Sequence, residues 1–151
     1  MGKEISKKRE KAINEFVKEC KKKFGKNLIS VVLFGSVARG TATKYSDIDL
    51  LVVVKDLPAD WRKRDKLLDD VVMNILLKYQ LRIFPIIATP KAIINSQEIG
   101  NPLFYGILTG YKKLFDKNSF FEGVMNNVRL KVNAEKPVFY DKVRKWELAK
   151  M

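Results

Sequence analysis

The sequence predicts an α/β fold in which a small mixed β-sheet is backed by helices. Two apolar runs with the character of buried strands, 28–34 and 47–54, alternate with two amphipathic stretches of helical period, 3–24 and 58–79. The second run is apolar on both faces, which favours a central strand under helices. With 151 residues, of which 46% are apolar and 31% charged, the chain has the composition of one globular domain.

The first predicted element is a helix over residues 3–24. Its apolar residues recur at helical spacing, and Gly25 follows as a natural stop. The opposite face is rich in lysine and arginine, which we interpret as a solvated face, with a nucleic-acid-binding face as the alternative. Residues 28–34 then form a buried strand, and residues 35–46 form a loop with room for one helical turn.

A second long helix and a third strand follow the 47–54 strand. The helix begins at Pro58, with Asp56 as its cap, and continues to about residue 79. The strand is predicted at about 81–87, and Pro85 makes it an edge strand or a bulged one.

The chain from about residue 89 onward is predicted to be a helical extension. Its helix signals are Thr89–Pro90, Asn101–Pro102 for a helix to about 115, and a Ser119/Glu122 capping box for a helix over about 120–132. The tail from residue 137 onward is aromatic and basic, and either packs on the core or serves a partner. We therefore divide a single domain, 1–151, into a core of about 3–88 and an extension of about 89–151.

The composition excludes several kinds of site. Histidine is absent and Cys20 is the single cysteine, which excludes an internal disulfide, a Cys/His zinc site and a histidine base. Thirty basic and 17 acidic residues give a net charge of +13, which favours nucleic acid, nucleotides or an acidic partner, with the lysine-rich surface of a thermophile as the alternative. We see no signal peptide or membrane span, so we expect a cytoplasmic protein without a membrane partner.

Residues 34–50 carry the most information about function. A Gly35-Ser36 turn follows the first strand, and Asp47 and Asp49 open the second. Because side chains alternate along a strand, the two carboxylates are expected on one face, near the backbone N–H groups of the turn. Paired carboxylates suit a hard cation and the turn suits phosphate, so the pattern predicts a site for a nucleoside triphosphate and Mg²⁺.

The spacing of Gly35-Ser36, ten residues, then Asp47-Ile48-Asp49 resembles the signature of the DNA polymerase β-like nucleotidyltransferase superfamily. The strings Gly-Ser-Val-Ala-Arg-Gly and Ser-Asp-Ile-Asp-Leu are similar to those of its minimal, prokaryotic branch. The resemblance implies a metal-dependent enzyme that transfers a nucleoside monophosphate from a triphosphate, with ATP as the expected donor, to a hydroxyl acceptor.

The same resemblance implies roles for individual residues. Asp47 and Asp49 would be the catalytic residues and would coordinate one or two Mg²⁺ ions, while Gly35 and Ser36 would hold the triphosphate. The further nucleotide-binding positions are Arg39, which contacts phosphate or braces the loop, Gly40, which supplies a special backbone conformation, and Ser46.

One departure from the family pattern bears on activity. Active members generally carry a third carboxylate on a neighbouring strand, whereas residues 81–87 contain no Asp or Glu. Glu98, Asp116 or a partner protein would have to supply it. The resemblance also implies a helical HEPN-type partner in a toxin–antitoxin pair. The alternative function is therefore a catalytically degenerate, antitoxin-like subunit that binds nucleotide or nucleic acid and acts through its partner.

Overall fold

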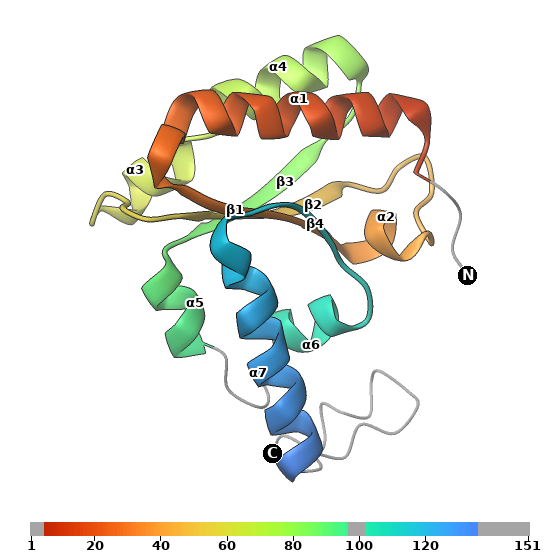
Figure 1. Ribbon diagram of the computed structural model, residues 1–151. Helices are drawn as coiled ribbons and strands as arrows, with labels where there is room; N and C mark the ends of the chain where they lie inside the picture. The colour runs from red at the N-terminus through yellow and green to blue at the C-terminus, as the bar shows by residue number, and fades with distance from the viewer. Residues whose placement is uncertain (1–4, 97–101, 136–151) are drawn as a thin grey trace.

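The computed structural model describes residues 5–96 and 102–135, which build a four-stranded sheet with helices on both faces (Figure 1). The strands are β1 (Leu28–Phe34), β2 (Ile48–Val54), β3 (Ile83–Ala88) and β4 (Lys112–Asp116), in the order β3–β2–β1–β4. β1 is antiparallel to β2 and β4, and β2 is parallel to β3. The predicted mixed sheet backed by helices is therefore confirmed.

Two groups of helices cover the two faces of the sheet (Figure 1). The helices are α1 (Lys7–Phe24), α2 (Gly35–Arg39), α3 (Trp61–Lys66), α4 (Asp69–Tyr79), α5 (Pro90–Ser96), α6 (Pro102–Leu108) and α7 (Phe120–Glu135). Leu50 and Val52 of β2 pack in the core under α1 and α4, whereas Leu51 and Val53 pack with α5, α6 and α7. Because side chains alternate, Asp49 shares the face of Leu51 and Val53.

The sequence predictions for the core are largely confirmed. The first helix ends with Gly25 as its C-cap, and β1 covers the predicted residues 28–34. β2 is an inner strand with six of its seven residues buried, as its apolar faces indicate.

β3 is an edge strand, as Pro85 predicts. The Ile48 N–H donates to the Arg82 carbonyl at 2.9 Å, so the backbone groups of Arg82 and of every second residue after it face β2. The backbone groups of Pro85 therefore point away from β2, so the N–H that proline lacks interrupts no hydrogen bond of the sheet. Because this N–H is also missing from the exposed edge of β3, another strand pairs less readily with that edge.

The second predicted helix is wrong in its start and its continuity. Helix α3 begins at Trp61, and its cap is Asp60, whose carboxylate accepts the Arg62 N–H at 3.0 Å, rather than Asp56. The chain then breaks at residues 67–68 before α4 begins. The capping side chain nearest the helix start decides where it begins, and the propensity of Pro58 for a first turn does not outweigh it.

The helix predicted from Asn101–Pro102 to residue 115 is also wrong beyond Leu108. Gly110 ends the helical stretch by donating its N–H to the Ile107 carbonyl at 2.9 Å, and residues 112–116 form β4. Apolar spacing in this segment fits a helix, but pairing with β1 supplies every second backbone group with a partner, and this tertiary context overrides the local pattern.

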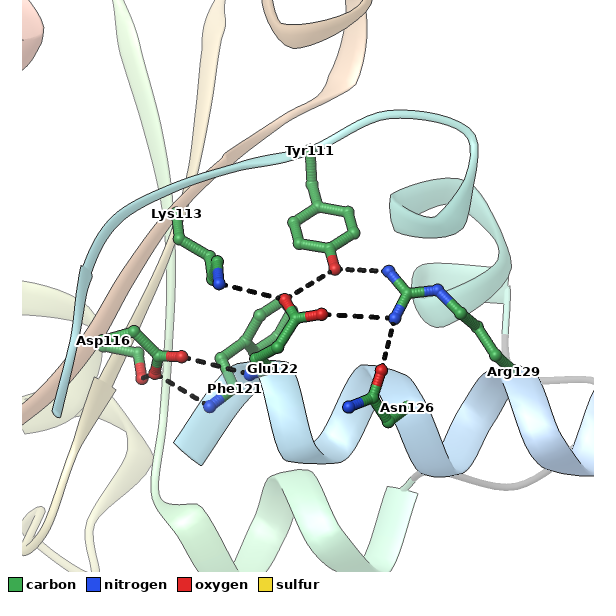
Figure 2. A network of polar contacts seen from close by, with 8 residues as sticks. Tyr111, Lys113, Asp116, Phe121, Glu122, Asn126 and Arg129 are labelled. Atoms are coloured by element: carbon green, nitrogen blue, oxygen red, sulfur yellow. Dashed lines mark hydrogen bonds and ion pairs between the residues drawn. The ribbon is translucent and has the colours of Figure 1, made fainter. Parts of the chain in front are cut away.

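The predicted Ser119/Glu122 capping box does not form. Ser119 has a positive φ of 55°, and the carboxylate of Asp116 instead accepts the N–H groups of Phe121 at 2.8 Å and Glu122 at 3.1 Å (Figure 2). Asp116 also accepts the hydroxyl of the fully buried Ser30 at 2.7 Å, so it fastens α7 to the sheet.

A second polar cluster holds α7 against the start of β4 (Figure 2). Glu122 accepts the Tyr111 hydroxyl at 3.0 Å and forms ion pairs with Lys113 at 3.2 Å and with Arg129 at 3.4 Å. Arg129 also donates to the Tyr111 hydroxyl and to Asn126. These contacts fix the α6–β4 connection, which borders the site described below.

Two sequence predictions concern residues outside the described ranges, namely Glu98 and the tail from residue 137 onward. Among the helices that the structure describes, none combines the length and apolar character needed to cross a bilayer.

Candidate active site

The glycine corner and the second aspartate lie in direct contact. Gly35 has a φ of +77°, which favours glycine, and a Cβ built on it would lie 2.1 Å from the Asp49 Oδ2 atom. Phe34 is the register partner of Asp49, so the turn after β1 places the backbone of α2 beside the first residues of β2. The predicted meeting of the Gly35-Ser36 turn with Asp49 is therefore present in the fold.

The electrostatics of Asp49 are those of a partly buried carboxylate with a like-charged neighbour. Burial raises its pKa above the ordinary value of 3.8, the charge of Asp47 raises it further, and Arg39 lowers it. This influence of Asp47 agrees with the alternation of side chains, which places residues 47 and 49 on one face. Such a pair gains from a cation that offsets both charges.

Asp47 directly precedes β2 and is more open to solvent. Its side chain is 43% exposed, and its Oδ1 atom lies 3.8 Å from the Nε atom of Arg82, which is itself 73% exposed. This pair is long and solvated, so it contributes little to stability and leaves the carboxylate available for another partner.

The loop between α2 and β2 is braced by hydrogen bonds that use Ser46. The Thr43 N–H donates to the Ser46 hydroxyl oxygen at 2.9 Å, and the Ser46 N–H donates to the Thr43 carbonyl at 3.1 Å. Arg9 of α1 also donates to that carbonyl, at 2.6 Å. Ser46 thus shapes the approach to Asp47 from within the loop, and Arg9 anchors the loop to the first helix.

Helix α2 carries the other predicted phosphate-binding residues. Gly40 caps it in the left-handed conformation, with φ 76° and ψ 20°, as expected for a special glycine. Ser36 is the second residue of α2, whose first N–H groups have no partner within the helix. Arg39 is exposed; a Cβ added at Gly110 would lie 2.9 Å from its Cγ atom, so its stem passes close over the α6–β4 turn.

No third carboxylate joins Asp47 and Asp49 among the described residues. Phe84 of β3 is the register partner of Asp49, and no group of three or more Asp, Glu, Cys or His side chains occurs in residues 5–96 and 102–135. Asp116 pairs with Ser30, four residues before Phe34 on β1 and therefore roughly 13 Å from the site. Its carboxylate is committed to the α7 cap.

The donor set fits Mg²⁺ as an incomplete site. Two carboxylates are what Mg²⁺ usually takes from a protein, since it completes an octahedron with water and substrate phosphates. The raised pKa of Asp49 and the half-open Asp47 agree with this donor set. Asp47 and Asp49 would hold such an ion, and it would supply charge neutralisation for a bound polyphosphate.

Sequence reasoning missed four residues around this site. Arg9 was interpreted as part of a solvated face, although it is half-buried and holds the loop. Gly110 falls inside a wrongly predicted helix, and a glycine there could have signalled the helix end. Arg82 and Phe84 come beside the aspartates through parallel pairing of β3 with β2, and no local pattern foretells that register.

Known proteins are similar to this chain in sequence over most of its length. Residues 13–109 match the family model of the nucleotidyltransferase domain. A Methanocaldococcus jannaschii protein named "Putative protein adenylyltransferase MJ1305" is 42% identical over 137 residues, covering 91% of this chain and 92% of its own. A second one from the same organism, MJ0604, is 39% identical over 92 residues, covering 61% of this chain and 78% of its own.

Solved structures show the same fold at low sequence identity. Spectinomycin adenyltransferase AAD(9) of Enterococcus gives a TM-score of 0.58 at 17% identity, covering 87% of this chain and 69% of its own. A chain of a toxin–antitoxin structure with AMP-PNP gives a TM-score of 0.52 at 18% identity, covering 87% of this chain and 98% of its own. The family model and the sequence relatives show that this chain belongs to the nucleotidyltransferase family.

Proposed function

We propose that this chain is a Mg²⁺-dependent adenylyltransferase that moves AMP from ATP to a hydroxyl group on a partner protein. The observation that carries the proposal is the contact of the Asp49 carboxylate with the Gly35 corner, with Asp47 beside it at the start of an inner strand. The similarity to relatives named protein adenylyltransferase supports a protein acceptor.

Each residue of the site has a distinct task in this proposal. Gly35 and Ser36 bind the triphosphate through the first N–H groups of α2 and the serine hydroxyl, and Arg39 approaches it from the end of that helix. Gly40 and Ser46 hold the ends of the loop that leads to the aspartates. Asp47 and Asp49 would hold one or two Mg²⁺ ions, which would supply charge neutralisation of the triphosphate and activation of the acceptor hydroxyl.

The reaction is a displacement at the α-phosphorus. The acceptor oxygen bonds to the α-phosphorus while the bond between that phosphorus and the oxygen bridging to the β-phosphate breaks. Pyrophosphate therefore leaves, and the hydroxyl proton passes to water. The residues of the chain contribute positioning and electrostatic stabilisation, because the described residues offer no further carboxylate as a base beside Asp49.

The partner is proposed to be a helical HEPN-type protein in a toxin–antitoxin pair. A chain of a toxin–antitoxin structure with AMP-PNP shares the fold, which supports this assignment by analogy. A nucleotide-binding, antitoxin-like subunit without turnover is the second candidate. The observation that favours it is Phe84, which stands beside Asp49 where the neighbouring strand could have supplied a carboxylate.

The test uses ATP labelled at the α-phosphate, with ATP labelled at the γ-phosphate as its control. The full chain is incubated with Mg²⁺ and an extract of the source cells, and labelled protein is detected after electrophoresis. We expect label from the α-phosphate alone, and none after Mg²⁺ is removed with EDTA. Asp47→Asn and Asp49→Asn should each reduce labelling roughly hundredfold or more, because metal stabilisation is worth several kcal/mol.

Asp56→Asn is the matched control, because Asp56 is exposed and lies beyond the opposite end of β2. Labelling that persists in both site variants would contradict the enzyme proposal. Mg²⁺-dependent ATP binding without any labelled product would instead support the subunit that acts by binding.

A further inference from the structure

The turn between α6 and β4 lies beside the glycine corner, on the side away from the aspartates. Leu33 of β1 is the register partner of Lys112 and Phe34 is that of Asp49, so the end of β1 has β4 on one side and β2 on the other. Antiparallel pairing brings the residues just before Lys112 towards Gly35, which follows β1. The turn thus borders the proposed triphosphate site opposite Asp49.

Gly110 of this turn lies against the stem of Arg39, the last residue of α2. A Cβ built on Gly110 would lie 2.9 Å from the Arg39 Cγ atom, 3.7 Å from its Cα atom and 3.8 Å from its Cβ atom. The first distance is too short for two carbon atoms, whereas the other two are ordinary contacts. Gly110 is not among the glycines with a positive φ, so its backbone suits alanine, and the Arg39 side chain is what excludes a larger residue.

Tyr111, the next residue, fastens the turn to α7. Its hydroxyl donates to Glu122 at 3.0 Å and accepts a hydrogen bond from Arg129 (Figure 2). Its ring meets the fully buried ring of Phe121 edge to face, with the ring centroids 5.7 Å apart. The backbone hydrogen bond that ends α6 holds the turn from its other side. Because the turn is held on both sides, a larger residue before Tyr111 would displace Arg39 rather than the turn.

The path of the Arg39 side chain matters because its charge acts on the site. The charge of Arg39 lowers the pKa of Asp49, in agreement with a guanidinium on the side of that carboxylate. A guanidinium also suits phosphate, since it presents several N–H donors in one plane to the phosphate oxygens. The contribution of Arg39 to nucleotide binding therefore depends on the path that its stem takes past Gly110.

We propose that the α6–β4 turn directs Arg39 towards the triphosphate, and that Gly110 and Tyr111 are positioning residues of the nucleotide site. Gly110 leaves the space in which the Arg39 stem lies, and Tyr111 keeps that space in place by its contacts with α7. The inference rests on the proposed function, in which Arg39 approaches the triphosphate, and adds two residues that act on the nucleotide through Arg39. It also gives α7 a role in nucleotide binding.

The first test measures the affinity of the full chain for a non-hydrolysable ATP analogue with Mg²⁺, by calorimetry. Arg39→Ala should weaken binding about tenfold, because it removes a charge-assisted contact to phosphate. Gly110→Ala should weaken binding about fivefold, because it displaces the arginine from its productive position. The double variant should bind like Arg39→Ala alone, since the methyl group at residue 110 makes only ordinary contacts once the Cγ atom is gone.

Tyr111→Phe tests the attachment of the turn to α7. The substitution keeps the ring contact with Phe121 and removes the hydroxyl that bonds to Glu122 and Arg129. It should weaken binding of the analogue about threefold in the wild-type chain, because the loosened turn no longer holds Arg39 in one position. In the Arg39→Ala chain it should have no effect on affinity.

Two variants serve as matched controls. Gly106→Ala adds a methyl group to a glycine of α6 at which nothing lies within 4 Å of the new Cβ atom. Tyr79→Phe removes a hydroxyl that bonds to Glu15 at 2.9 Å, between α4 and α1 and thus on the face of the sheet away from Asp49. Both should bind the analogue within about twofold of the wild-type chain.

The second test needs no nucleotide and compares melting temperatures. The effect of Gly110→Ala should be about 2–4 °C less favourable in the wild-type chain than in the Arg39→Ala chain, because only the former has an arginine stem to be forced off its rotamer. In the Arg39→Ala chain the added methyl group should be neutral or stabilising, because alanine reduces the conformational entropy of the unfolded chain.

Three outcomes would overturn this inference. Gly110→Ala could weaken nucleotide binding equally in the wild-type and Arg39→Ala chains, which would make its effect independent of Arg39. Arg39→Ala could bind the analogue as well as the wild-type chain does. Tyr111→Phe could lower the melting temperature and leave the affinity unchanged, which would make the contacts with α7 purely structural. A wild-type chain that binds no nucleotide would instead contradict the proposed function, and the melting temperatures would still decide whether Gly110 directs Arg39.

Discussion

Replacement of Gly35 by alanine tests the glycine corner and the aspartate pair together. The added Cβ meets the Asp49 Oδ2 atom at 2.1 Å, and the backbone at this position has a φ of +77°. The left-handed conformation costs alanine about 1–2 kcal/mol. Displacing the Asp49 side chain from its rotamer adds about 1 kcal/mol.

The total of about 2–3 kcal/mol translates into a lower melting temperature, by roughly 4–12 °C for a chain of this size. Gly35→Ala should also weaken nucleotide binding, for a separate reason. The Asp49 carboxylate must turn away from the new methyl group. A nucleotide at a hundredfold excess over its Kd stabilises the wild-type chain by about 2.7 kcal/mol. A tenfold weaker affinity in Gly35→Ala reduces that gain to about 1.4 kcal/mol.

The assay is a thermal unfolding series with and without a non-hydrolysable ATP analogue and Mg²⁺. Gly25→Ala is the control, because Gly25 also has a positive φ, +53°, but nothing within 4 Å of the added Cβ. It should lower the melting temperature and keep the full stabilisation by nucleotide. The reasoning is refuted if Gly35→Ala retains the wild-type gain, or if Gly25→Ala loses it as well.

Three further predictions concern the rest of the fold. Asp116→Ala should cost about 2–3 kcal/mol in urea unfolding, because it leaves Ser30 and the start of α7 without an acceptor, yet nucleotide affinity should not change; a loss of affinity would instead place Asp116 in the metal site. Burial raises the pKa of Cys20 to about 12, so a thiol reagent at pH 8 should modify it only after denaturation, and rapid modification of the native chain would contradict its burial. A hydrogen bond from Lys78 lowers the pKa of Glu15 below its ordinary value of 4.5, so this stabilisation is present above pH 4.5 and is lost on acidification. Lys78→Met should therefore lose less stability than wild type between pH 7 and pH 3, and equal losses would disprove the linkage.

The part of the fold that the sequence could predict is the part that rests on local signals. The apolar run of β2 and the position of Gly25 after an amphipathic helix each depend on residues near in sequence. The meeting of the Gly35-Ser36 turn with Asp49 also rests on local signals. Only 15 residues, from the end of one strand to the start of the next, bring the turn and the aspartate together.

The errors arise where distant residues decide the structure. β4 forms because it pairs with the edge of β1 that β2 does not occupy. The apolar residues of this segment recur at helical spacing, and that local pattern cannot reveal a pairing with a distant strand. The start of α7 follows the same rule, since its cap comes from Asp116 across a turn in which Ser119 has a positive φ. Arg82 and Phe84 join the site through the parallel pairing of β3 with β2, which brings together residues more than 30 positions apart in the sequence.

The central claim is that Asp47 and Asp49 share a divalent ion with a triphosphate anchored at Gly35-Ser36. A crystal structure of the full chain with a non-hydrolysable ATP analogue and Mn²⁺ tests this most directly, because Mn²⁺ is located by its anomalous signal. We expect the signal between the two carboxylates, with the β- and γ-phosphates at the N-terminal end of α2. Mn²⁺ bound elsewhere, or a triphosphate that avoids the glycine corner, would contradict the account.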